Sequence, residues 1–91
     1  MNPRIFKKDL SEYGYSMEVD VKKDDCNREA AHWHLCKNGR RIGQIMVPRC
    51  VWTELPSDCS RRVIAEAEEL TREYADEIES VYNYNRLNGA G

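Results

Sequence analysis

Residues 31–47, AHWHLCKNGRRIGQIMV, decide the fold, because two strand-like runs stand on either side of Asn38 and Gly39. Asn-Gly is the pair most typical of a type I′ turn, which needs a positive φ at both central positions. We therefore predict an antiparallel hairpin with strands at residues 31–36 and 41–47. The two-residue loop also predicts the pairs Leu35–Ile42, Trp33–Gln44 and Ala31–Met46 on the core face, and His34–Gly43 and His32–Ile45 on the opposite face.

Shorter segments flank this hairpin. Residues 15–21, YSMEVDV, alternate between apolar and polar side chains, which is typical of a half-buried strand. Pro48 is expected to end the second hairpin strand, because proline has no amide hydrogen to donate to a ladder. Residues 51–52 fit a short fourth strand, and the first dozen residues fit either a short helix or an edge strand.

From residue 57 onward the apolar residues recur with the period of a helix. The predicted apolar stripe contains Val63, Ala67, Leu70, Tyr74, Ile78 and Val81, widened by Ile64, Thr71 and Tyr82. Ser57 or Asp58 is expected to cap the start, and Asn88-Gly89 to close the end. The sequence therefore predicts one α+β domain over residues 1–91. A small antiparallel sheet of three to four strands (residues 15–53) packs against one long C-terminal helix (residues 57–87).

The length of this helix suggests a partner. About 30 residues at about 1.5 Å each give a rod of roughly 45 Å. A compact chain of this size has a diameter of only about 30 Å. We therefore expect either a break near residues 82–85, or an overhang that packs against a second copy of the chain or another protein.

Composition limits the class of protein. Charged residues make up 33% and hydrophobic residues 41% of the 91 residues, as in an ordinary folded domain. The formal net charge is −2, with ten Lys/Arg against eight Asp/Glu in residues 1–56 and four against eight in residues 57–91. No apolar run is long enough for a signal peptide or a membrane span. The four cysteines form no Cys-x-x-Cys pair, so we expect a cytoplasmic protein with reduced thiols and no membrane partner.

His32 and His34 are the first candidate for chemistry. Residues i and i+2 of a strand share a face, so both imidazoles could reach one zinc ion. A third ligand would have to be brought close by the folding of the chain, and the candidates are Cys26, Glu29 and Cys50. Histidines that are structural or face a partner are the commoner case. The local sequence offers these histidines no nucleophile or carboxylate, so we assign no catalytic residue and no cofactor, with zinc as the alternative.

Charged side chains form the remaining candidates. Five acidic residues of the predicted helix lie opposite its apolar stripe: Glu66, Glu69, Glu73, Asp76 and Glu77. This face is either simply solvated or a docking surface for a basic partner. Arg40 and Arg41 follow the hairpin turn and could contact a partner or a phosphate. Nucleic-acid binding is the lesser alternative, because the sequence shows no helix-turn-helix, zinc finger or stacking aromatic platform.

The order of these elements resembles a known family. The chain contains, in this order, Pro-Arg-Ile-Phe at residues 3–6, a strand, the His32-Trp33-His34 strand, a hairpin return, and Leu55-Pro56 before a terminal helix. This arrangement resembles the small bacterial domain-of-unknown-function family (number 4160), whose members are often encoded beside toxin–antitoxin-type genes. The chain departs from the family at Ala30 and Ala31, where prolines are usual. The resemblance carries over no catalytic residue, and only the histidine pair matches as a shared feature.

We therefore expect a small non-enzymatic protein of bacterial or phage origin that binds another macromolecule. It would act as a toxin–antitoxin-like accessory protein or as an inhibitor of a host defence system, through the helix or the histidine-bearing sheet face. The partner would be another protein or, through the C-terminal helix, a second copy in a homodimer. The alternatives are a small metal-dependent or RNA-cleaving enzyme that uses His32 and His34, and a nucleic-acid-binding regulator.

Overall fold

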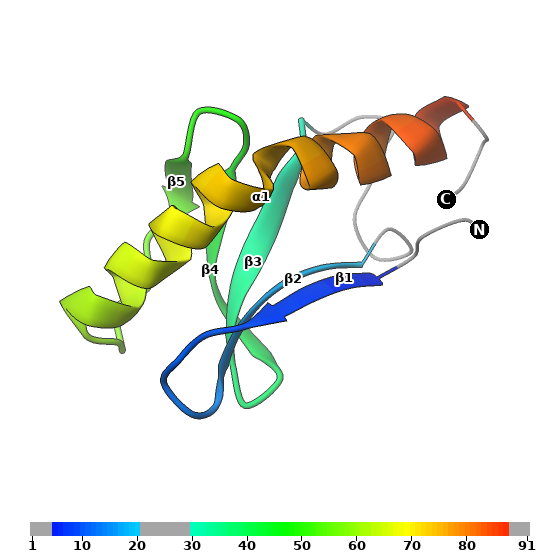
Figure 1. Ribbon diagram of the computed structural model, residues 1–91. Helices are drawn as coiled ribbons and strands as arrows, with labels where there is room; N and C mark the ends of the chain where they lie inside the picture. Colours follow the sequence, from blue (N-terminus) through cyan, green and yellow to red (C-terminus); the bar gives the residue numbers. More distant parts are fainter. Residues whose placement is uncertain (1–4, 21–29, 88–91) are drawn as a thin grey trace.

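The computed structural model describes residues 5–20 and 30–87, which form a five-stranded sheet and one helix (Figure 1). The elements are β1 (Ile5–Asp9), β2 (Tyr15–Asp20), β3 (His32–Lys37), β4 (Arg40–Met46), β5 (Val51–Glu54) and α1 (Arg61–Leu87). Each strand pairs antiparallel with the next, in the spatial order β1-β2-β3-β4-β5. The α+β prediction is confirmed, with β1 as the fifth strand. No helix in the described ranges is long and apolar enough to cross a membrane.

The β3–β4 hairpin has the predicted turn but not the predicted register. Asn38 (φ 51°) and Gly39 (φ 82°) both have positive φ, and the two pairs nearest the turn are Lys37–Arg40 and Cys36–Arg41. Beyond them a bulge in β4 shifts the pairing by one residue. The observed pairs are Leu35–Gly43, His34–Gln44, Trp33–Ile45 and His32–Met46, so the predicted pairs from Leu35 onward are wrong.

The physical reason for the bulge is burial. A one-residue shift moves the following side chains of a strand to its other face. With Ile42 as the extra residue, Ile45 lies opposite Trp33, and both side chains are fully buried. The predicted register would instead have placed the polar Gln44 opposite Trp33. In the predicted register Gly43, which has no side chain, would face His34 and leave space beside it; in the observed register Gly43 lies opposite Leu35.

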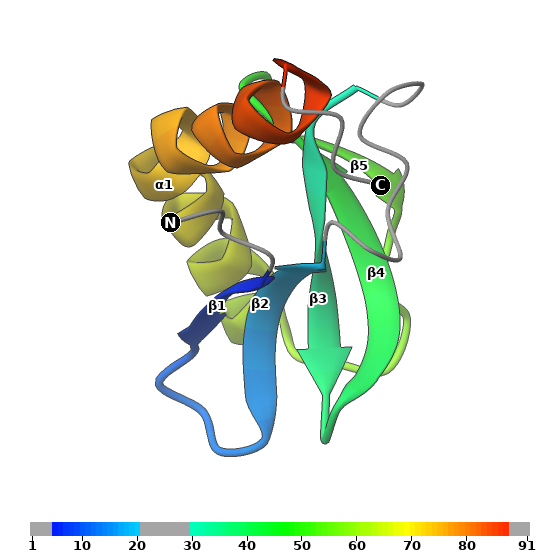
Figure 2. The ribbon, with the colours of Figure 1, turned by 90° about the vertical axis from the view of Figure 1, so that its right-hand side faces the viewer.

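The core lies between α1 and one face of the sheet (Figures 1 and 2). The sheet contributes Met17, Val19, Trp33, Leu35 and Ile45, and α1 contributes Val63, Ala67, Thr71, Ala75, Ile78 and Tyr82. Leu70 and Tyr74, which the predicted stripe included, are only half-buried at its flank. The small side chains of Thr71 and Ala75 lie nearer the sheet, and the Trp33 indole N–H donates to the Thr71 hydroxyl at 2.9 Å.

Helix α1 starts later than predicted. The Ser60 hydroxyl accepts the backbone N–H of Val63 at 3.3 Å, so Ser60 is the N-cap, and the predicted cap at Ser57 or Asp58 is wrong. The residues before the helix pack against β4 instead, since Pro56 is buried and lies against Gly43. The predicted C-terminal cap, Asn88-Gly89, falls outside the described residues.

The helix is kinked at Tyr74 (φ −107°, ψ 15°), not near residues 82–85 as predicted. One turn earlier, the Thr71 hydroxyl donates to the Ala67 carbonyl at 2.7 Å, a side-chain bond that bends helices. After the kink the last turns lie above the start of β3 (Figure 2), and Tyr82 is fully buried.

The expected overhang is therefore absent from the described helix. The longest dimension of the molecule is 38 Å, close to the roughly 40 Å that 27 helical residues span. Because the domain itself buries Ile78, Val81 and Tyr82 after the kink, helix length no longer argues for a partner.

Candidate functional site

His32 and His34 alternate along β3 with the core residues Trp33 and Leu35, and both are buried. His32 is 2% and His34 is 6% exposed, and their rings meet edge to face at a centroid distance of 5.1 Å. Nδ1 of His32 lies 2.9 Å from the Ala30 carbonyl oxygen and 3.1 Å from the Tyr82 hydroxyl. His34 is flanked by its strand partners Glu18 and Gln44. These contacts join the end of α1 to the start of β3, which is a structural role.

A metal site at these histidines stays a prediction, with few ligands nearby. In residues 5–20 and 30–87 no three His, Cys, Asp or Glu side chains are grouped so that they could hold a metal ion. Of the expected third ligands, Cys26 and Glu29 fall outside those ranges. The Cys50 thiol lies 3.6 Å from the Glu68 carbonyl of α1.

The thiols of Cys36, Cys50 and Cys59 are held in their protonated form. Burial, and then the charge and hydrogen bond of Glu18, raise the pKa of Cys36 to about 12. Burial likewise raises the pKa of Cys50 and of Cys59, although Arg72 and Lys37 respectively oppose the shift. Since the thiolate is the ligand and nucleophile, these three side chains remain protonated and unreactive at neutral pH.

Of the five acidic residues predicted on the outer face of α1, four remain as a candidate docking surface. Glu66 belongs to the fold, because its carboxylate accepts the backbone N–H of Ser11 at 2.9 Å and the Ser11 hydroxyl at 2.8 Å. The others, Glu69, Glu73, Asp76 and Glu77, are exposed and form no ion pair with any described residue. Carboxylates at i, i+3 and i+4 repel one another by a few tenths of a kcal/mol per pair. A cation would relieve this repulsion, whereas a second copy of the same face would increase it.

At one end of the sheet the β1–β2 and β3–β4 turns lie side by side (Figures 1 and 2). The Asn38 backbone N–H donates to the Gly14 carbonyl at 2.7 Å. Gly14 has a φ of 90°, and a Cβ there would meet the Asn38 side chain at 2.8 Å, so only glycine allows this approach. Both hairpin tips are thereby held in one place relative to the start of α1.

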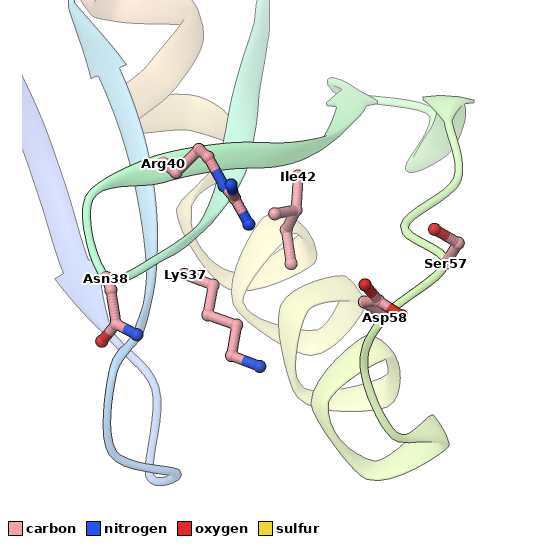
Figure 3. A pocket seen from close by; sticks show the side chains of 6 residues that line it. All are labelled: Lys37, Asn38, Arg40, Ile42, Ser57 and Asp58. Carbon is pink, nitrogen blue, oxygen red and sulfur yellow. The ribbon is translucent and has the colours of Figure 1, made fainter.

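A hollow of about 580 Å³ opens between the β3–β4 turn and the segment before α1 (Figure 3). The described residues that line it are Lys37, Asn38, Arg40, Ile42, Ser57 and Asp58. Lys37 and Arg40 extend into the hollow from the hairpin, and Asp58 lies across from them. Of the two predicted arginines, Arg40 therefore lines a concave surface, whereas Arg41 is exposed but does not line this hollow. We refer to this feature as the basic hollow.

A second hollow, of about 420 Å³, lies at the opposite end of β4. Its described lining is almost wholly apolar and consists of Ala30, Met46, Val47, Pro48, Arg49 and Val51. Met46 pairs with His32 on one side and with Val51 on the other, so the hollow lies at the rim of the histidine-bearing face. Val51, which lines the hollow, is 51% exposed, and Leu55, just past the other end of β5, is 68% exposed. We refer to this feature as the apolar hollow.

Three features of these surfaces were not identified from the sequence: the edge position of β5, the position of the Lys37 cation in a hollow and the exposed ring of Tyr13. The sequence predicts a short strand at residues 51–52, but nothing local shows that β5 is the edge of the sheet. Lys37 is, in the sequence, one of several loop cations. Tyr13, which is 97% exposed at the β1–β2 turn, carries a usable signal: an aromatic residue before Gly14, in a polar turn, has no core to enter.

Comparison of the chain with models of known protein families, with curated proteins and with solved structures finds no match in any of the three. The evidence for function is therefore the geometry of these surfaces.

Proposed function

We propose that this is a small non-enzymatic protein that binds an extended, apolar segment of another protein at the β5 edge of its sheet. The observation that carries the proposal is the apolar hollow next to that edge, with Val51 half-exposed between them. Exposed apolar surface beside a free strand edge favours a protein partner over a soluble small molecule.

The two edges of the sheet differ in how they are protected. β1 carries Lys7, Lys8 and Asp9, and charged side chains on an edge discourage further strand pairing. β5 carries one charge, Glu54, and no described strand pairs with its outer side. β5 is short, and its register with β4 shifts at Thr53, so main-chain pairing alone would be weak. The apolar hollow would supply the affinity, and the strand edge would align the incoming segment.

The enzyme alternative has less support. His32 and His34 are almost fully buried, so a substrate could reach neither imidazole without a rearrangement of the sheet face. A homodimer through α1 is also less favoured. The apolar stripe of α1 is already covered by the sheet of the same chain, and the outward face would bring four carboxylates against four.

The biological setting that we propose is a toxin–antitoxin-like accessory protein or an inhibitor of a host defence system. It rests on the resemblance carried by residues 3–6, His32–His34 and Leu55-Pro56. Either role requires the protein to bind another protein, and a hydrophobic strand edge would provide the binding surface.

The proposal can be tested with a phage-displayed library of linear peptides, panned on the immobilised protein. Selected peptides should alternate apolar and polar residues, and their backbone amides should become protected from hydrogen exchange on binding. Val51→Lys should weaken these peptides by at least tenfold, because it places a charge at the rim of an apolar hollow. Ala65→Lys adds the same charge at an exposed position of α1 and should leave binding unchanged.

Three results would count against the proposal. Panning could enrich no peptide; enriched peptides could bind the Val51→Lys variant as well as the parent; or they could shift amide resonances away from residues 46–54. If sedimentation instead shows a dimer that Val51→Lys abolishes, the occupant of the edge is a second copy, and the proposed hetero-partner is wrong.

A further inference from the structure

The hairpin end of the molecule combines features that suit a different ligand. Asn38 lines both the basic hollow and a neighbouring hollow of about 480 Å³. The second hollow is bounded by the β1–β2 turn, including Tyr13 and Gly14. The two hollows therefore form one concave surface across both hairpin tips.

The cations of this surface are available to a ligand. Lys37 and Arg40 form no ion pair with any residue in the described part of the chain. The Lys37 ammonium lies 5.5 Å from the centre of the Tyr15 ring, and its charge opposes the rise that burial causes in the pKa of Cys59, so it faces the segment just before α1. Asp58 is the one carboxylate among the described residues of the basic hollow, which leaves this hollow a net positive charge.

The neighbouring elements extend this charge beyond the hollow. The first turn of α1 contains Arg61 and Arg62, both exposed, and no acidic residue. The N-terminal end of a helix carries a partial positive charge, so two arginines there repel it unless an anion is near. The second hollow is net negative, with Lys7 against Asp9 and Glu12. Cations are therefore present both in the basic hollow and at the start of α1, which suits a ligand with several phosphates better than a single phosphate.

The neighbouring hollow carries an exposed aromatic ring. Tyr13 is 97% exposed, which is the largest exposure among the large hydrophobic residues that the structure describes. Its backbone is held by the turn, since the Leu10 N–H donates to the Tyr15 carbonyl at 3.0 Å and the Tyr15 N–H to the Glu12 carbonyl at 3.3 Å. An exposed ring on an ordered turn, in a hollow that adjoins a basic one, can serve as a surface on which an unpaired base stacks.

We infer that the hairpin end binds single-stranded nucleic acid, with phosphates at Lys37 and Arg40 and a base stacked on Tyr13. A duplex keeps its bases paired and offers none to the ring. An acidic protein segment would use the cations but not the ring. Asp58 and Glu12 oppose the phosphates, so the affinity is modest and strongly dependent on salt. This inference does not rest on the proposed function, because it uses the opposite end of β4 and different residues.

The test is fluorescence anisotropy of a labelled 12-nucleotide oligo(dT), the matching oligo(U) and a 12-base-pair duplex, at 50 mM salt and in a salt series. The single strands should bind more tightly than the duplex, with a slope of log K against log salt of about −1.4 for two phosphates. Lys37→Gln combined with Arg40→Gln should weaken binding at least tenfold and bring the slope close to zero. Tyr13→Ala should weaken it by about 5- to 150-fold with the slope unchanged.

Matched variants serve as controls. Arg49→Gln removes an exposed cation at the other end of the sheet, and Val51→Lys alters only the apolar hollow, so neither should reduce binding. Tyr13→Phe keeps the ring and should bind like the parent. The inference is overturned if no oligonucleotide binds at 50 mM salt, if poly-glutamate competes as well as oligo(dT), or if the duplex binds equally and Tyr13→Ala has no effect.

Discussion

Gly43 is the residue at which the register of the sheet can be tested most directly. A Cβ at this position would lie 3.0 Å from Cδ of Pro56, 3.1 Å from the Glu54 carbonyl oxygen and 3.2 Å from Cζ3 of Trp52. All three distances are shorter than ordinary van der Waals contact. None of these atoms is the end of a flexible side chain, since they belong to a proline ring, a main-chain carbonyl and a half-buried indole. Gly43→Ala must therefore push the end of β5 away from β4.

The magnitude follows from two opposing effects. Overpacking a well-packed site typically destabilises a protein by about 1–3 kcal/mol. Replacing glycine by alanine restricts the unfolded chain, which stabilises by about 0.4–1 kcal/mol. The midpoints of these two ranges leave a net loss of about 1.3 kcal/mol, for which the melting temperature should fall by about 5–10 °C in a domain of this size. In the register predicted from the sequence, Gly43 faces His34 with space beside it, and the same substitution would be neutral or stabilising.

Thermal unfolding followed by circular dichroism measures the change, and the indole N–H resonances locate it. The Trp52 indole, which donates to Glu68 at 2.7 Å, should shift, whereas the Trp33 indole should not. Gly39→Ala is the control: Gly39 has a φ of 82°, and a Cβ there would meet no atom within 4 Å, so the substitution introduces backbone strain without crowding β5. An unchanged or higher melting temperature for Gly43→Ala would refute the observed bulge and its packing.

Two further predictions concern α1. Thr71→Val should destabilise by about 1–3 kcal/mol in urea titrations, because the buried Trp33 indole N–H loses its acceptor. Thr71→Ser keeps that acceptor and should shift the Trp33 indole resonance less; equal shifts in both variants would contradict the assigned bond. Ser60→Ala should lower stability by about 1 kcal/mol, because it removes the N-cap, whereas Ser57→Ala should change it by under about 0.5 kcal/mol. The reverse ranking would restore the cap predicted from the sequence.

Local signals in the sequence were sufficient for the elements themselves. Asn38-Gly39 predicted the turn because positive φ at both positions is a property of those two residues. The alternation of residues 15–21 predicted β2, and the period of Val63, Ala67 and Ile78 predicted α1 and its buried face. Each of these depends on neighbours within a few positions along the chain.

Non-local contacts decided what the sequence could not show. The bulge at Ile42 exists because it brings Ile45 to Trp33, and the kink at Tyr74 allows Tyr82 to reach His32. The predicted acidic face also lost Glu66 to a distant partner, since Ser11 lies in a turn fifty-five positions earlier. No periodicity within a single element carries information of this kind.

The bulge also connects the two proposed surfaces. Ile42 lines the basic hollow, and the residues after it, displaced by one position, bring Met46 beside Val51 at the apolar hollow. Strand β4 therefore forms part of both hollows, one at each end. The six steps from Arg40 to Met46, at about 3.4 Å each, separate them by roughly 20 Å. Effects at sites more than about 10 Å apart are usually additive, so a strand added at β5 and a nucleic acid at the hairpin end should bind independently. The two proposals together describe an adaptor, in which β4 would hold a protein segment and a single-stranded nucleic acid at a fixed distance from each other.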